Sequence, residues 1–171
     1  MRRLVGKIAV VTGGGSGLGA AAAKRLAAEG ATAIVADIDE DEARRVAIEI
    51  SDAGGDAEPT VVDVTHEGEV AALFEAIVEQ HGRLDVLVCS AAVETRASVV
   101  DTTDAAWRRV LDVNLKGPFL CMKHGLGPMV SSGGGSVILL GSVLGGSKTG
   151  GQGDGGSITD ILGGLLGGGR R

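Results

Sequence analysis

Residues 7–19 read KIAVVTGGGSGLG, and this stretch decides the fold. Its first half, Lys7–Thr12, is short, apolar and rich in β-branched residues, which predicts a strand buried on both faces of a sheet. Its second half is rich in glycine and leads into Ala20–Glu29, which predicts a helix that ends at Gly30. A glycine turn between a strand and a helix favours binding of a pyrophosphate, because helix N-terminal amides and the helix dipole attract negative charge.

Strand-like and helix-like segments alternate along the rest of the chain. Apolar runs predict four further strands, and amphipathic runs with capping residues predict three further helices. We expect an α/β fold, a doubly wound parallel sheet of about five strands with helices on both faces. The expected strands are Thr32–Ala36, Ala57–Val62, Asp85–Cys89 and Ser136–Leu140. The first two expected helices begin at the cap Asp39 and end at about Ala53, and cover Glu67–His81. The third begins at a cap, Thr103 or Asp104, and ends at a break over Ser131–Gly135.

Composition narrows the class of protein. With 171 residues the chain is long enough for one domain, and a net charge of −6 without a basic patch argues against nucleic acid as a partner. No secretory leader and no apolar span of membrane length are present, so we expect a cytoplasmic protein that does not enter a membrane. Cys89 and Cys121 lie in apolar surroundings, which predicts buried free thiols, and the three histidines show no metal-site spacing.

The last part of the chain differs in character from the rest. Twelve of the 27 residues from 145 to 171 are glycine, and too few apolar side chains are present to offset the entropy that glycine loses on folding. We expect residues 1–143 to form a nucleotide-binding domain and residues 144–171 to form a disordered or loosely attached tail. A Gly-rich linker to a partner is the alternative.

The glycine turn and the motifs that follow it resemble one family. Thr12, Gly13, Gly17 and Gly19 match the TGxxxGxG pattern of short-chain dehydrogenases/reductases of the classical type, and the resemblance covers about residues 5–143. It implies a Rossmann-like fold with the strand order 3-2-1-4-5, and a nicotinamide cofactor. The cofactor-binding residues that it implies in this turn are Gly13, Ser16, Gly17, Leu18 and Gly19.

Asp37 ends the second expected strand, about 20 residues past the glycines. A carboxylate there accepts hydrogen bonds from both ribose hydroxyls and repels a 2′-phosphate. In the family this position sets cofactor choice, and no Arg or Lys occupies Ser16 or Ile38 to favour NADP. NAD is therefore the expected cofactor. Alternatively Asp37 only begins the next helix, a role that Asp39 fills better.

Two further segments carry the resemblance. Asp63 and Val64 follow the third strand, where the family holds the adenine; a plain strand-end cap is the alternative reading of Asp63. After the fourth strand the family usually has NNAG, whereas this chain has Cys-Ser-Ala-Ala at residues 89–92. Ser90 and Ala91 are expected beside the cofactor, and the methyl group of Ala92 is expected to lower cofactor affinity.

The catalytic residues of the family are matched only in part. Asn114 matches a helix asparagine whose carbonyl holds a water in a proton relay, with a simple helix kink as the alternative. Ser142 matches the serine that binds the substrate carbonyl, with a turn serine as the alternative. The family's YxxxK pair has no counterpart: residues 154–156 are Asp-Gly-Gly, and the chain contains no tyrosine. Loss of such a proton-transfer group costs roughly 10²–10⁴-fold in rate.

Three hypotheses for function follow. The resemblance implies an NAD-dependent oxidoreductase that acts on a small alcohol or ketone, with turnover impaired or lost in this chain. Alternatives are an NAD-binding module without turnover, and a truncated or frameshifted fragment of such an enzyme, since the sequence changes character near residue 145. The family's sheet continues for two more strands, so Ser136–Leu140 is expected at an edge and the usual dimer face is incomplete. A homo-oligomer remains open.

Overall fold

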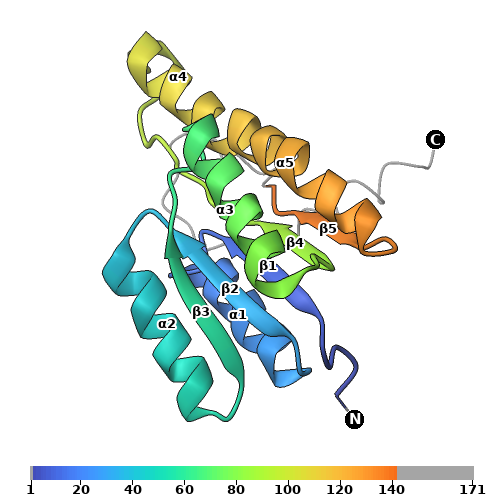
Figure 1. Cartoon of the computed structure of the whole chain (residues 1–171). Coiled ribbons are helices and arrows are strands. Elements are labelled where there is room, and N and C mark those ends of the chain that lie inside the picture. The colour runs from blue at the N-terminus through green and yellow to red at the C-terminus, as the bar shows by residue number, and fades with distance from the viewer. Residues whose placement is uncertain (1, 142–171) are drawn as a thin grey trace, which may run out of the picture. The chain divides into compact units, whose positions relative to one another are not determined.

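The computed structural model describes residues 2–141, and its sheet is centred on β1 (Ile8–Thr12), every residue of which is buried. Five parallel strands follow the order β3-β2-β1-β4-β5 (Figure 1), which confirms the expected Rossmann-like sheet. Thr12, at the end of β1, pairs with Ala36 on one side and Cys89 on the other. The carboxyl ends of β1, β2 and β4 therefore meet at one edge of the sheet, where sheets of this kind bind their ligands.

The elements alternate as the sequence predicts. The remaining strands are β2 (Thr32–Asp37), β3 (Asp56–Val61), β4 (Val86–Cys89) and β5 (Ser136–Leu139). The α-helices are α1 (Gly17–Ala28), α2 (Glu40–Asp52), α3 (Glu67–His81), α4 (Asp104–Leu111) and α5 (Gly117–Ser131). Two short helical segments complete the described chain: a 3-10 turn, η1 (Val99–Asp101), and a π-helical segment, η2 (Asp112–Lys116).

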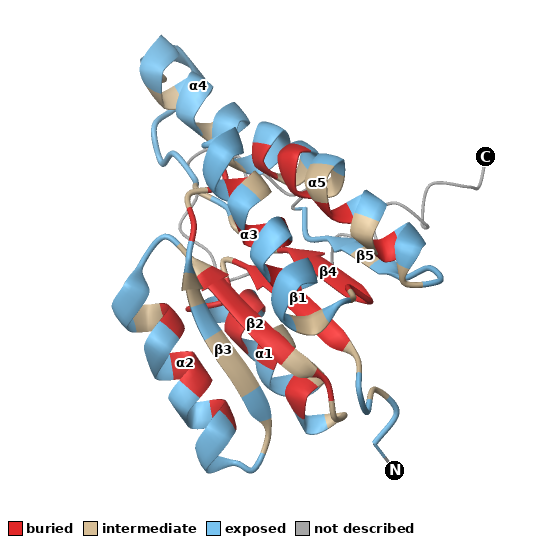
Figure 2. Ribbon diagram, viewed as in Figure 1, coloured by how far each residue is buried: buried red, intermediate tan, exposed pale blue. Residues whose placement is uncertain are grey.

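Each face of the sheet has its own hydrophobic core. Alternate residues of β1 point to opposite faces, so that Ile8 and Val10 join one core and Ala9 and Val11 join the other. The first core includes residues of α3 and α5, among them Phe74, and the second includes residues of α1 and α2. Figure 2 shows β1, β2 and β4 as the buried centre of this arrangement. Aliphatic side chains dominate both cores, as the shortage of aromatic residues predicts, and Cys89 and Cys121 are buried free thiols.

Two helices differ from the expectation. Helix α1 begins at Gly17 instead of Ala20, so the last glycines of the turn already belong to its first turn. The long helical stretch after Thr103 is divided into α4 and α5 by the π-helical η2. Other boundaries agree within one residue, and the bounds of α3 agree fully: Gly82 ends this helix with a φ of 69°, a left-handed conformation that suits glycine.

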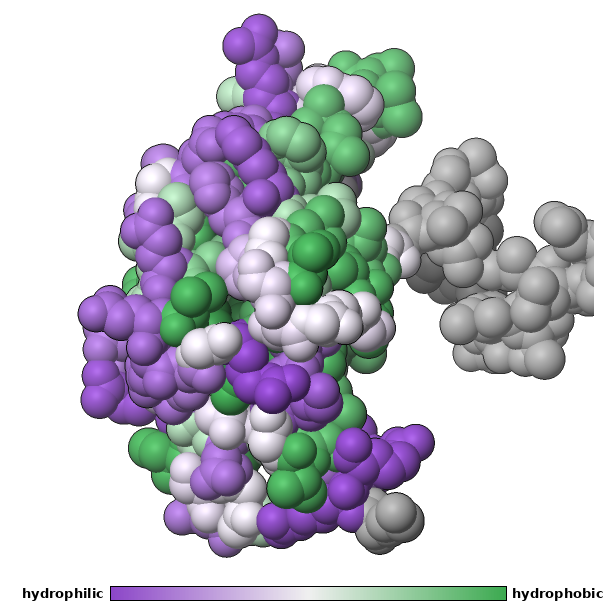
Figure 3. Space-filling model, turned by 45° about the vertical axis from the view of Figure 1, so that its right-hand side comes forward, coloured by the Kyte–Doolittle hydropathy of each residue, from purple (hydrophilic) through white to green (hydrophobic). Residues whose placement is uncertain are grey.

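Strand β5 lies at the edge of the described sheet and is poorly covered. Ile138, Leu139 and Leu140 are 42%, 52% and 40% exposed, which agrees with the prediction of an apolar edge. Apolar side chains of α4 and α5, including Trp107 and Phe119, also reach the surface. Figure 3 shows one face of the molecule, on which green apolar areas are interspersed with hydrophilic ones. No helix within residues 2–141 is long and apolar enough to cross a membrane. The expected tail, residues 144–171, lies outside the described residues.

Candidate functional site

The glycine turn is packed directly against the end of β4. A Cβ atom added at Gly13 would lie 2.6 Å from the backbone nitrogen and Cα of Ala91, and φ at Gly13 is +66°. A Cβ atom added at Gly19 would lie 2.0 Å from the carbonyl oxygen of Gly13. Both contacts are with backbone atoms, so neither position accepts a side chain without a shift of the chain. These two glycines let the turn, the start of α1 and the end of β4 approach one another.

Gly17 differs from the other glycines of the motif. Its φ is +51°, and a Cβ atom added there would meet nothing within 4 Å. The neighbouring residues, Ser16 and Leu18, are exposed, and Ser16 makes no side-chain cap to α1, whose first turn holds no acidic residue. The first amides of α1 thus lie at an open surface, where the helix dipole favours an anion. The space and the donors fit a pyrophosphate group.

Asp37 lies beside this turn, as the sequence predicts. Its Oδ2 accepts a hydrogen bond from the amide of Gly15 at 2.9 Å, and its Oδ1 accepts one from the amide of Asp39 at 3.1 Å. Asp39, and not Asp37, is the N-cap of α2 and accepts from the amide of Glu42 at 3.1 Å. The alternative reading of Asp37 as a helix cap is therefore wrong. The half-buried carboxylate is held next to the glycine turn, with the exposed Ile38 following it.

Asp63 closes a turn after β3. Its Oδ1 accepts hydrogen bonds from both the amide and the hydroxyl of Thr65, at 2.9 Å and 2.8 Å. Burial raises the pKa of the Asp63 carboxyl, but these two bonds and the neighbouring His66 outweigh burial, so its pKa lies below the usual value. The alternative reading of Asp63, a cap at the end of a strand, is thus present in the structure. Its contact with an adenine stays a prediction. Val64 is buried, and a Cβ atom added at Gly117 would touch its side chain.

The segment after β4 brings three predicted residues to the same edge. The amide of Ser90 donates to the carbonyl of Thr12 at 3.1 Å, and its hydroxyl lies 3.2 Å from the position of a Cβ atom on Gly19. Ala91 packs on Gly13 and is half-buried, whereas Ala92 is exposed. Ser90 and Ala91 therefore pack against the glycine turn. The effect of the Ala92 methyl group on cofactor affinity stays a prediction.

Asn114 lies in the π-helical η2 and is tied to the chain after β4. Its side-chain oxygen accepts from the amide of Val93 and its side-chain nitrogen donates to the carbonyl of Val93, both at 2.9 Å. Asn114 therefore lies in an irregular part of the helix and also has a hydrogen-bond partner there. π-helical turns are frequent at functional sites. Its role in a proton relay stays a prediction. Ser142, the other predicted catalytic residue, lies outside the described residues.

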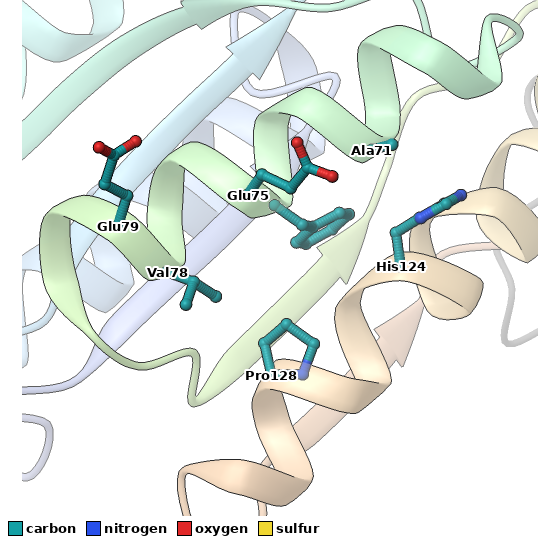
Figure 4. Close-up of a pocket in the computed structure, with 7 residues that line it drawn as sticks. Ala71, Glu75, Val78, Glu79, His124 and Pro128 are labelled. Carbon is teal, nitrogen blue, oxygen red and sulfur yellow. The ribbon is translucent and has the colours of Figure 1, made fainter.

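One hollow of the described surface lies away from these residues. It has a volume of about 430 Å³ and lies between α3 and α5, where Phe74, Val78, His124 and Pro128 contribute to its lining (Figure 4). Of the predicted cofactor-binding and catalytic residues, none that falls within residues 2–141 lines it. The candidate site is therefore the surface at the carboxyl ends of β1, β2 and β4, and not this hollow.

Sequence reasoning missed two residues at the site. Gly15 is an unspecified position of the family motif, yet a Cβ atom there would lie 2.8 Å from Cβ of Glu42 and 2.9 Å from Oδ2 of Asp37. Arg45 of α2 donates from Nη2 to the carbonyl of Gly15 at 2.9 Å. The sequence separation of 30 residues hides this contact, and only the return of α2 alongside β2 creates it.

Comparisons with known proteins agree with this geometry. The profile of the family described as short chain dehydrogenase matches residues 7–153. The chain is 43% identical over 140 residues to a cis-4-hydroxycyclohexanecarboxylate dehydrogenase of Sinomonas cyclohexanicum, covering 81% of this chain and 56% of that protein. It is 38% identical over 143 residues to a 3-alpha-(or 20-beta)-hydroxysteroid dehydrogenase of Mycobacterium tuberculosis, covering 84% of this chain and 54% of that protein.

Solved structures show the same likeness. A metagenomic short-chain oxidoreductase in complex with NADP superposes with a TM-score of 0.75 at 36% identity, covering 78% of this chain and 61% of that one. A putative short-chain dehydrogenase/reductase from Burkholderia xenovorans gives a TM-score of 0.77 at 35% identity, covering 80% of this chain and 56% of that one. The chain thus spans less than two thirds of the length of these relatives.

Proposed function

Because the chain belongs to the short-chain dehydrogenase family, whose members use nicotinamide cofactors, we propose that residues 1–143 form a domain that binds NAD in preference to NADP. The observation that carries this proposal is the position of Asp37, whose carboxylate lies beside the glycine turn with Oδ2 on the amide of Gly15. A carboxylate there accepts hydrogen bonds from ribose hydroxyls and repels a 2′-phosphate.

The other cofactor contacts follow from the same geometry. The open N-terminus of α1 at Gly17 receives the pyrophosphate, and Ser90 and Ala91 line the path along the end of β4. Asp63 and Val64 lie toward the adenine end, where the Asp63 carboxylate keeps acceptor capacity beyond its bonds to Thr65. When bound, the nicotinamide ring supplies the acceptor or donor of a hydride.

The reaction proposed for the whole enzyme type is hydride transfer between the cofactor and a small alcohol or ketone. The names of two relatives, a hydroxycyclohexanecarboxylate dehydrogenase and a hydroxysteroid dehydrogenase, support secondary alcohols on carbon rings as the first substrates to test. Asn114 and Ser142 are the catalytic residues that this chain retains. Because the chain has no tyrosine, we expect NAD binding without appreciable turnover.

Calorimetric titration with NAD and NADP tests the binding proposal. We expect NAD to bind at least about tenfold more tightly than NADP, and Asp37→Asn to reduce that ratio toward one, because it removes the charge and keeps an acceptor for Gly15. Asp41→Asn is the matched control, since Asp41 is an exposed acid in the first turn of α2. Absence of NAD binding at millimolar cofactor would refute the proposal.

Turnover is tested by absorbance of the reduced nicotinamide with a panel of alicyclic secondary alcohols. We expect no signal above the background rate from this chain. A clear signal would contradict the inference drawn from the missing tyrosine and would favour the alternative, an active dehydrogenase.

A further inference from the structure

The carbonyl of Gly15 is held by one residue of α2 that no family motif predicts. Arg45 donates from Nη2 to this carbonyl at 2.9 Å, while the amide of the same glycine donates to Oδ2 of Asp37 at 2.9 Å. The two peptide units that flank Gly15 are therefore each held by a charged side chain, one by an anion and the other by a cation. Gly15 is buried between them, against the first turn of α2.

The orientation of the Gly15 carbonyl fixes the next amide. In a trans peptide the C=O and N–H groups point in opposite directions, and the described backbone contains no cis bond. Because Arg45 draws the Gly15 carbonyl toward α2, the amide of Ser16 points away from α2. A rotated peptide would present a carbonyl oxygen, with its partial negative charge, where the amide now lies.

Arg45 is itself held in place by two acidic side chains. Nη2 lies 2.6 Å from Oε2 of Glu42 and Nη1 lies 2.6 Å from Oε1 of Glu49. Glu49 also pairs with Lys24 of α1 at 2.5 Å. Hydrogen bonds from Glu42 and Glu49 raise the pKa of the Arg45 guanidinium further above its usual value. The guanidinium is therefore fixed in one place, directed at the Gly15 carbonyl, by residues from both helices on this face of the sheet.

These ion pairs are exposed, so they contribute little to stability. Arg45, Glu42 and Glu49 have side chains 47%, 45% and 41% exposed, and exposed pairs of this kind contribute about 0–1 kcal/mol. A network that adds little stability but fixes a cation on the backbone of the glycine turn is better explained by the geometry that it imposes. Arg44, the preceding residue, pairs only with Glu40 within the described contacts and does not touch the turn.

We propose that Arg45 is a positioning residue for cofactor binding: by holding the Gly15 carbonyl toward α2, it keeps the amide of Ser16, the N-cap of α1, directed away from α2 and toward the proposed pyrophosphate site. This inference rests on the proposed binding of a dinucleotide at that turn. The same contacts keep Arg45 from serving a 2′-phosphate, because its guanidinium is already shared among Glu42, Glu49 and the Gly15 carbonyl. Arg45, held in this way, and the carboxylate of Asp37 thus both favour a ribose without a 2′-phosphate.

Amide hydrogen exchange in the free protein tests the positioning role without any ligand. In Arg45→Ala we expect faster exchange over residues 13–20 than in wild type, with no change elsewhere in the sheet, and a thermal midpoint within about 4 °C of wild type. Arg44→Ala is the matched control and should exchange as wild type does. Equal exchange of the two variants over residues 13–20 would overturn the proposal.

Calorimetric titration with NAD tests the consequence for the cofactor. We expect Arg45→Ala to weaken NAD binding by about tenfold, Arg45→Lys to recover most of that loss through one remaining donor, and Arg44→Ala to bind as wild type. Equal NAD affinities of Arg45→Ala and Arg44→Ala would also overturn the proposal. If the wild type itself fails to bind NAD, the proposed function fails, whereas the exchange experiment still decides whether Arg45 orders the turn.

Discussion

Two alanine substitutions in the glycine motif should differ: Gly19→Ala should cost mainly stability, and Gly17→Ala mainly affinity for the cofactor. At Gly19 an added Cβ atom would lie 2.0 Å from the carbonyl oxygen of Gly13 and 2.8 Å from its carbonyl carbon. At Gly17 an added Cβ atom would touch nothing, and only the φ of +51° opposes a side chain. The first position is limited by packing and the second by backbone conformation alone.

The expected magnitudes follow from these contacts. Overpacking costs about 1–3 kcal/mol, and we place Gly19→Ala at about 3 kcal/mol because both clashing atoms belong to the backbone and cannot rotate away. A left-handed conformation costs a non-glycine residue about 1–2 kcal/mol, so we expect about 1 kcal/mol for Gly17→Ala. The methyl group of Gly17→Ala would, however, occupy the surface proposed for the pyrophosphate. This variant should therefore remain folded and lose NAD affinity.

Urea unfolding followed by circular dichroism measures the first effect. With a denaturant slope of about 2 kcal/mol per molar, the two variants should differ by about 1 M in their unfolding midpoints. Calorimetric titration of Gly17→Ala with NAD measures the second. Equal loss of stability in both variants, or a larger loss in Gly17→Ala, would refute the packing argument; unchanged NAD affinity in Gly17→Ala would refute the placement of the pyrophosphate.

Three further predictions concern other parts of the structure. Asp85 is buried and holds β1 to β4, and hydrogen bonds from Arg83 keep the pKa of its carboxyl well below the usual value, so Asp85→Asn should lower the free energy of unfolding by about 2 kcal/mol in urea titrations. That difference should be constant above about pH 5 and should shrink as pH falls below about 4, because the Asp85 carboxyl of the unfolded wild-type chain then gains a proton while the folded one, with its lower pKa, is still charged. Asn114→Ala removes two hydrogen bonds to Val93 and should speed amide exchange over residues 91–98, while the core strands exchange as before. We expect the exposed apolar edge to cause self-association in sedimentation velocity and Leu139→Lys to reduce it; a wild type that sediments as a monomer, or an unchanged variant, would contradict this expectation.

The parallel sheet was predictable because each strand carries its own signal, and the strand order followed from the family resemblance. The buried runs of β1, β2 and β4 are apolar on both faces, and the intervening helices are amphipathic, so that only a parallel sheet with two covered faces fits the pattern. The bounds of α3 were predictable as well, since Gly82 ends the helix locally. Asp37 and Asp39 could be told apart because a helix cap needs a fixed offset from the first turn.

Contacts between distant residues were beyond sequence reasoning. Asn114 in the π-helical η2 is hydrogen-bonded to Val93, 21 residues earlier, and the presence of an asparagine within a helix does not identify its hydrogen-bond partner. The early start of α1 was hidden for a related reason. Glycine has low helix propensity, so Gly17–Gly19 predict a turn by themselves, and the helix forms there because the turn is packed on Ala91 and on α2.

The glycines of the motif are therefore required for two different reasons, packing and backbone conformation, which the sequence pattern does not distinguish. Gly13 and Gly19 are required by the close approach of backbone segments, whether or not a ligand is ever bound. Gly17 has no neighbour that excludes a side chain, and its left-handed φ is one that asparagine also tolerates. Packing thus accounts for the first two glycines, whereas at the third only the left-handed φ opposes a side chain. A ligand that approaches the backbone at the start of α1 would be a second reason for glycine there, which makes Gly17 the glycine of the motif that bears most directly on the proposed cofactor binding.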